Sequence, residues 1–91
     1  MHRYIIEREL IGAGSLSMDQ LRDVSQISNQ VLRDMGPGIQ WIQSYVTADR
    51  IYCIYLADNE QMVREHAKRG GLPCTRLNEI LRVIDPMTAI A

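Results

Sequence analysis

The alternation of hydrophobic and polar positions divides the chain into short strand-like runs and longer helical stretches. Residues 4–10, 39–46 and 51–56 are rich in β-branched and aromatic side chains and are bounded by glycines or polar turn residues, which is typical of β-strands. Residues 77–84 are expected to form a last strand before Pro86, although their apolar spacing would also suit a short helix. The pattern therefore predicts four strands.

Two helical stretches lie between these runs. Ser17-Met18-Asp19-Gln20 has the form of a capping box, and apolar positions then recur at helical spacing until Gly36-Pro37-Gly38 ends the helix. The second helix is expected to begin near Asp58 or Asn59 and to end before Gly70-Gly71. The first helix carries one apolar stripe, into which a single serine falls: Leu21, Val24, Ser28, Val31, Leu32 and Met35.

The predicted order of elements is strand, helix, strand, strand, helix, strand. Short connections and right-handed crossovers arrange this order as a four-stranded antiparallel sheet with both helices on one face. The expected fold is therefore α+β, of the ferredoxin-like βαββαβ kind, in a single domain over residues 1–91. A chain of this length can bury one core and no more.

A tight hairpin with Ala48-Asp49 as its loop would place Ser44 opposite Cys53 and Ile42 opposite Tyr55. Because side chains alternate along a strand, the hairpin has two faces. One face is expected to carry Ile42, Ser44, Val46, Ile51, Cys53 and Tyr55, and the other Trp41, Gln43, Tyr45, Tyr52, Ile54 and Leu56. The second face is too apolar to remain in water on a small monomer, which predicts a homodimer; an apolar ligand lying on the sheet is the alternative.

Composition and charge narrow the class of protein. The chain is 46% hydrophobic and 23% charged, which is typical of a soluble globular domain. Its net charge of −1 argues against general binding to nucleic acid or to an anionic membrane. No apolar run approaches the roughly 20 residues that cross a bilayer, and carboxylates stand where a signal peptide would be apolar. We therefore expect a cytoplasmic protein in which Cys53 and Cys74 are free thiols.

His66 is the first candidate for chemistry because it falls on the helix face that is expected to pack against the sheet. Cys53 is expected to point toward the helices from a central strand, and a neutral imidazole with a thiolate can hold nickel, copper or zinc. The alternative is a histidine satisfied by one hydrogen bond beside a packed cysteine. Two donors do not complete a metal site, so further ligands would have to come from elsewhere.

Glu7 and Glu9 alternate onto one face of the first strand, and His2 lies near its start. Paired carboxylates can complete a metal site or act in acid–base chemistry. The alternative is ion pairing with nearby arginines, for which the chain offers Arg3, Arg8, Arg76 and Arg82. Cys74 follows Pro73 in an expected loop, and we interpret it as an ordinary exposed thiol.

Several stretches together resemble a known family. They are the strand from Trp41 to Val46, the pair Tyr52-Cys53, and Arg64-Glu65-His66-Ala67 before Gly70-Gly71. They look like a family of small bacterial proteins, first catalogued as a domain of unknown function, that includes a nickel-responsive, nickel-binding cytosolic protein with a dimeric ferredoxin-like fold. The resemblance implies the fold, a homodimer and a role in nickel binding, and it strengthens His66 as a candidate ligand, whose assignment rests on its position in the second helix.

Three hypotheses of function follow. The first is a non-enzymatic metal-binding protein, with nickel as the metal, His66 as a ligand, and Cys53, Glu7 and Glu9 as further candidate ligands. The second, by analogy of fold alone, is a cofactor-free enzyme or ligand-binding protein, with His66 as a general base in an apolar pocket lined by Tyr55 and Cys53. The third is a dimeric interaction module without chemistry. A cavity near His66 would favour the second, and a solid core the third.

Overall fold

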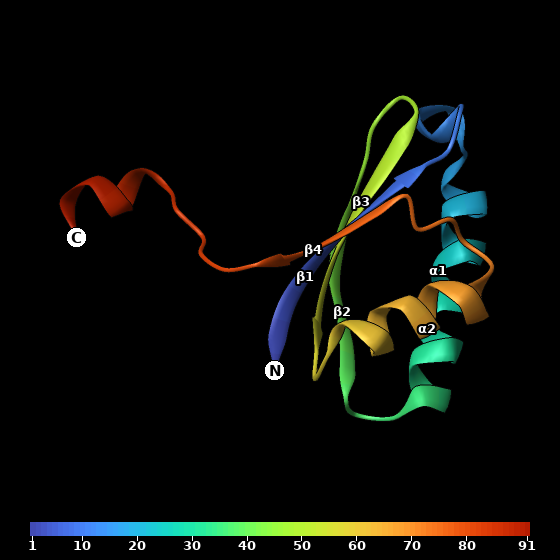
Figure 1. Cartoon of the computed structure of the whole chain (residues 1–91). Helices are drawn as coiled ribbons and strands as arrows, with labels where there is room; N and C mark the ends of the chain where they lie inside the picture. The colour runs from blue at the N-terminus through green and yellow to red at the C-terminus, as the bar shows by residue number, and fades with distance from the viewer.

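A four-stranded antiparallel sheet covered on one face by two helices forms the body of the protein in the computed structural model, which describes residues 1–91 (Figure 1). The sheet order is β2-β3-β1-β4. This confirms the expected ferredoxin-like α+β fold. In chain order the elements are β1 (His2–Glu9), the short 3-10 helix η1 (Ala13–Ser15), α1 (Met18–Met35), β2 (Ile39–Val46), β3 (Arg50–Ala57), α2 (Glu60–Gly70), β4 (Arg76–Ile80) and the 3-10 helix η2 (Pro86–Ile90).

The core lies between the central strands and the helices. β1 and β3 each have a neighbouring strand on both sides, and alternate side chains of both strands are buried toward the helices. These side chains are Tyr4, Ile6 and Arg8 from β1 and Ile51, Cys53, Tyr55 and Ala57 from β3. The placement of Cys53 on the helix side is therefore confirmed. The opposite side of the sheet carries the apolar residues Ile5, Tyr45, Tyr52, Ile54 and Leu56, which we call the open face.

A β-bulge in β2 changes one face of the predicted hairpin. Ser44 pairs with Cys53 as expected, but Trp41, not Ile42, pairs with Tyr55, because Ile42 is the extra residue of the bulge. The prediction that Ile42 faces the helices and Trp41 the open face is therefore wrong. The inserted residue reverses the face of the side chains that precede it in β2, so Trp41 lies on the same side as Ser44. There the indole Nε1 of Trp41 donates a hydrogen bond of 2.9 Å to the Ser44 hydroxyl.

The last strand is shorter than the sequence suggested. β4 ends at Ile80, and the expected strand or helix over residues 81–84 is not formed. Ile80 pairs with Arg3, so almost nothing of β1 remains to pair with the residues beyond it. Residues 81–91, which we call the arm, run away from the body on the side opposite the helices (Figure 1).

The start of α1 is fixed by the capping box that the sequence predicts. The Ser17 hydroxyl accepts from the Gln20 amide at 3.1 Å, and the Gln20 side chain accepts from the Ser17 amide at 2.9 Å. Asn59 caps α2 by a single hydrogen bond, in which its side-chain oxygen accepts from the Met62 amide at 3.0 Å. These caps set where each helix begins, and so which residues of α1 meet α2.

Ser17→Ala removes one half of this box. We expect a loss of about 1 kcal/mol in the free energy of unfolding, because the amide of Gln20 loses its partner at the exposed helix end. Urea denaturation measures the change. Ser15→Ala is the matched control, since the Ser15 side chain makes no hydrogen bond; equal losses in the two variants would contradict the assignment.

Candidate ligand cavity

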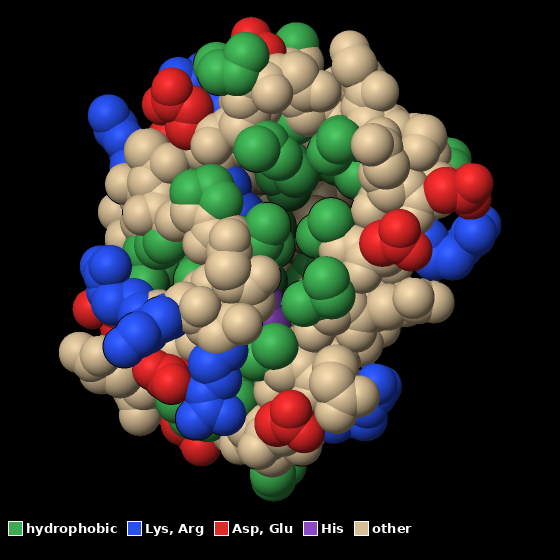
Figure 2. Space-filling view, turned by 90° about the vertical axis from the view of Figure 1, so that its right-hand side faces the viewer, with side chains coloured by type: hydrophobic (Ala, Val, Ile, Leu, Met, Phe, Trp, Pro, Cys, Tyr) green, Lys and Arg blue, Asp and Glu red, His purple; other side chains and the backbone are tan.

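A cavity of about 180 Å³ lies between the helix side of the sheet and α1. Its wall is mostly apolar, with Trp41, Cys53 and Tyr55 from the sheet. The short side chains of Ser25 and Ser28 on α1 leave this space between the layers. Figure 2 shows the helix side of the molecule, where hydrophobic side chains surround a central hollow.

Arg8 is the one charged residue in the cavity wall, and it is only 1% exposed. Its Nη1 donates to the carbonyl oxygen of Pro73 at 2.8 Å, and its Nη2 donates to the Tyr55 hydroxyl at 3.3 Å. Its Nε has no hydrogen-bond partner. None of the five ion pairs of the chain includes Arg8. Because arginine stays protonated, the cavity wall carries a buried positive charge without a carboxylate.

Tyr55 contacts both Arg8 and, on α2, His66. Burial, together with the nearby Cys53, raises the pKa of its phenol to about 12, although Arg8 opposes the shift. The hydroxyl is therefore neutral at pH 7 and offers a hydrogen-bond donor inside the layer. The rings of Tyr55 and His66 lie 5.1 Å apart between centroids and are tilted by 55°.

His66 is 1% exposed and lines a smaller hollow of about 70 Å³ that shares Val24, Ser28 and Leu72 with the main cavity. The location of His66 on the buried face of α2 confirms the sequence prediction. Its Nε2 lies 3.1 Å from the hydroxyl and 3.4 Å from the carbonyl oxygen of Ser28. A carbonyl only accepts, which favours a hydrogen on Nε2 and leaves Nδ1, which has no partner, as a bare nitrogen. Burial and the positive charge of Arg8 lower the pKa of the imidazole.

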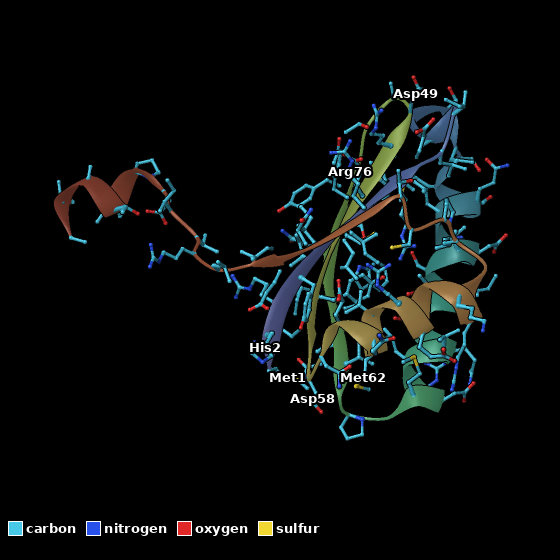
Figure 3. The ribbon with its side chains drawn as sticks, viewed as in Figure 1. Met1, His2, Asp49, Asp58, Met62 and Arg76 are labelled. Carbon is cyan, nitrogen blue, oxygen red and sulfur yellow. The ribbon has the colours of Figure 1, made fainter.

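The structure separates the four residues proposed as metal ligands into two groups. His66 and Cys53 lie in the layer between sheet and helices, whereas Glu7 and Glu9 alternate with the buried residues of β1 and so point away from that layer. Glu7 lies 3.7 Å from Arg76, the ion pair that the alternative interpretation expected; Figure 3 shows Arg76 on the side of the sheet away from the helices. No three of the His, Cys, Asp and Glu side chains converge to hold a metal ion.

The other candidate residues lie apart from the cavity. His2 is exposed and contacts Glu79 at 3.3 Å. Cys74 is half-buried against the core, and both it and Cys53 are free thiols.

Sequence reasoning missed the part played by Arg8, which we considered only as a surface partner for Glu7 and Glu9. The signal was present: strict alternation from Tyr4 through Ile6 places Arg8 on the same buried face. Ser28 gave a comparable signal, because it was the only polar residue in the apolar stripe of α1, and it contacts His66.

Comparison with known proteins agrees with this architecture. A family model described as "Nickel responsive protein SCO4226-like" matches residues 4–80. The chain belongs to this family. A solved structure described as a crystal structure analysis of SCO4226 from Streptomyces coelicolor A3(2) superposes with a TM-score of 0.76 over 90% of this chain and 99% of that chain, at 18% identity. No curated protein matches the chain.

Two further observations concern the extent of the family match and the character of the helices. The family match ends at the last residue of β4, so the arm lies outside it. Neither helix is both long enough and apolar enough to cross a membrane.

The buried His66 predicts a dependence of stability on pH. Its pKa is lowered in the folded protein, so below about pH 6.5 the unfolded chain binds a proton that the folded protein does not. The free energy of unfolding is therefore retained above that pH, and it decreases as the pH falls toward the folded-state pKa, by at most about 1.4 kcal/mol per pH unit.

Urea denaturation at about pH 7.5, 6.5 and 5.5 measures this dependence. His66→Gln keeps a donor for Ser28 and should flatten the curve in this range. A wild-type slope that survives His66→Gln would contradict the assignment.

Proposed function

We propose that this protein binds a small organic anion, a carboxylate on an apolar body, in the cavity beside Arg8. The observation that carries the proposal is the buried guanidinium in the cavity wall, which has no carboxylate partner in the chain. Buried charges in proteins are normally paired, because an isolated charge in an apolar interior is strongly disfavoured. A ligand carboxylate would supply the missing negative charge.

The size and lining of the cavity support a compact ligand. An apolar cavity of about 150 Å³ is known to accept benzene, so about 180 Å³ suits one ring with a small substituent. Trp41 and Leu72 offer apolar contact for such a body. The phenol of Tyr55 and the hydroxyl of Ser28 are neutral groups that can donate hydrogen bonds to an anion.

A reaction at this site is a narrower possibility. The bare Nδ1 of His66 is a neutral base near the cavity, and the imidazole is fixed by Ser28. These are the features that a general base needs, but binding is the function that the arrangement supports directly.

Benzoate is the probe for this proposal. We expect calorimetric titration to show benzoate binding to the full chain, weakened at least about tenfold by Arg8→Met, because a hydrogen bond to a charged group contributes about 1.5–3 kcal/mol. Benzyl alcohol has nearly the same shape without the charge. It should bind equally well to the wild type and the variant.

Two controls make the result decisive. Arg3→Met changes another arginine of β1 on the other side of the strand and should leave benzoate binding unchanged. Arg8→Met leaves the Pro73 carbonyl without its partner and should lower the stability by about 1–3 kcal/mol, so thermal unfolding is used to choose a temperature at which the variant is folded. Absence of benzoate binding, or binding that Arg8→Met leaves unaffected, would refute the proposal.

Nickel binding is the second candidate function, and the family description favours it. The residues of one chain do not fit a complete nickel site: His66 and Cys53 are two donors, Glu7 and Glu9 point elsewhere, and the charge of Arg8 repels a cation. A nickel site at His66 therefore requires donors from outside the chain.

Titration of metal-free protein with nickel chloride tests this second candidate. If nickel binds through His66, His66→Ala should weaken binding at least about tenfold, as loss of a ligand does, and His2→Ala should not. The reverse result would locate nickel at the exposed His2–Glu79 pair. No binding to the wild type would exclude a nickel site in the protein alone. With either candidate function, we propose that the protein acts in the cytoplasm.

A further inference from the structure

We propose that Cys53 is a modification site in the ligand cavity, where its thiol captures small carboxylates that carry an electrophilic carbon next to the carboxylate. Arg8 binds the carboxylate first, and the sulfur then attacks the neighbouring carbon. This proposal rests on the anion site proposed above and deepens it by naming a class of ligand that becomes covalently attached. Cys53 lines the cavity together with Arg8 and Tyr55, whereas the second cysteine of the chain, Cys74, does not.

The pairing of β1 with β3 brings the thiol and the guanidinium to the same place. Arg8 pairs with Ile51, and Ile6 pairs with Cys53, so Arg8 and Cys53 are diagonal neighbours on the helix side of the sheet. Diagonal neighbours lie about 7–8 Å apart, which a long side chain can span. The Nη2 of Arg8 contacts the hydroxyl of Tyr55, the next residue after Cys53 on this face. The arginine side chain therefore has neighbours on β3 on both sides of the thiol.

The electrostatics of Arg8 agree with this placement. Burial lowers the pKa of the guanidinium, but the neighbouring Tyr55 and Cys53 raise that pKa above its usual value overall. An effect of Cys53 on Arg8 requires the two groups to be close, as the strand register indicates. The Nε of Arg8 is buried and has no hydrogen-bond partner. A carboxylate that accepts from this free donor lies next to the sulfur of Cys53.

A small reagent can enter the cavity from the surface. Val46 belongs to the cavity wall and is 42% exposed, and Figure 2 shows the hollow between hydrophobic side chains on the helix side. The thiol itself is buried, since Cys53 is only 5% exposed. A reagent that reaches the sulfur through the cavity also meets the positive charge of Arg8. The site therefore selects reagents by their charge.

The covalent step needs no further reactant. The thiol gives its proton to water, and the thiolate sulfur forms a bond to the carbon next to the carboxylate. The bond between that carbon and its leaving group breaks, and the leaving group departs as an anion with the electron pair. The carboxylate stays beside Arg8 throughout, which holds the carbon near the sulfur. The product is a thioether of Cys53 whose own carboxylate neutralises the guanidinium.

Iodoacetate and the neutral iodoacetamide are the probes, because both alkylate thiols by this step and only iodoacetate is an anion. At one pH the fraction of ionised thiol is the same for both reagents and cancels from the ratio of their rates. We expect the ratio of the iodoacetate rate to the iodoacetamide rate to be at least about tenfold higher at Cys53 than for free cysteine, because Arg8 attracts the anion. Trypsin cleaves between the two cysteines, so mass spectrometry of the peptides attributes the label to Cys53 or Cys74.

Three variants of the full chain test the part played by charge. Arg8→Met should lower the ratio at Cys53 to that of free cysteine. Arg8→Lys also changes the contacts of this side chain but keeps the positive charge, and it should retain most of the preference for iodoacetate. Arg3→Met, on the other side of β1, should leave the ratio unchanged. Circular dichroism at the temperature of the labelling confirms that each variant is folded.

Three results would overturn the proposal: a ratio at Cys53 equal to that of free cysteine, no reaction of Cys53 with either reagent, or a raised ratio that survives Arg8→Met. Calorimetry with benzoate separates this failure from that of the anion site. Benzoate binding without a preference for iodoacetate would overturn the role of Cys53 alone, and loss of both would overturn the anion site as well. If the proposal holds, benzoate slows the labelling of Cys53 by iodoacetate, and the labelled protein no longer binds benzoate.

Discussion

The buried guanidinium of Arg8 constrains the rest of the core. It is held by the Pro73 carbonyl and the Tyr55 hydroxyl, so one side chain ties the loop after α2 to the central strands. A domain of 91 residues has a single small core, and a charge inside it displaces apolar packing that such a core needs. The cavity lies beside this charge. The packing between sheet and helices therefore combines an apolar cluster of ten buried residues with a polar centre at Arg8.

That charge also decides which chemistry the interior suits. A cation brought to Cys53 or His66 meets a buried positive charge at short range, where the surroundings screen it poorly. An anion placed there is attracted by the same positive charge. The lowered pKa of His66 follows the same logic, since Arg8 and burial both disfavour a second positive charge in the layer. The neutral imidazole, the neutral phenol of Tyr55 and the guanidinium thus form a consistent set for binding an anion.

Much of the fold could be predicted because its determinants are local. The capping box at Ser17, the cap at Asn59 and the alternation in β1 and β3 each depend on residues close in sequence. The bulge at Ile42 could not be predicted, because an extra residue in a strand is revealed only by the partner strand. The end of β4 likewise depends on its partner strand, because β1 offers almost no residue to pair beyond Arg3. For the site, His66 and Cys53 were located correctly by periodicity, whereas Arg8 was assigned by its charge to the surface although its position in the alternation was that of a core residue.

The bulge in β2 decides which of its apolar side chains lie on each side of the small sheet. By turning Trp41 toward the helices, the bulge gives the cavity an aromatic wall that regular pairing would have placed on the open face. The open face then keeps Tyr45, Ile54 and Leu56. Because neighbouring residues of β1 face the two sides of the sheet in turn, the strand that places Arg8 in the cavity wall also contributes Ile5 to the open face.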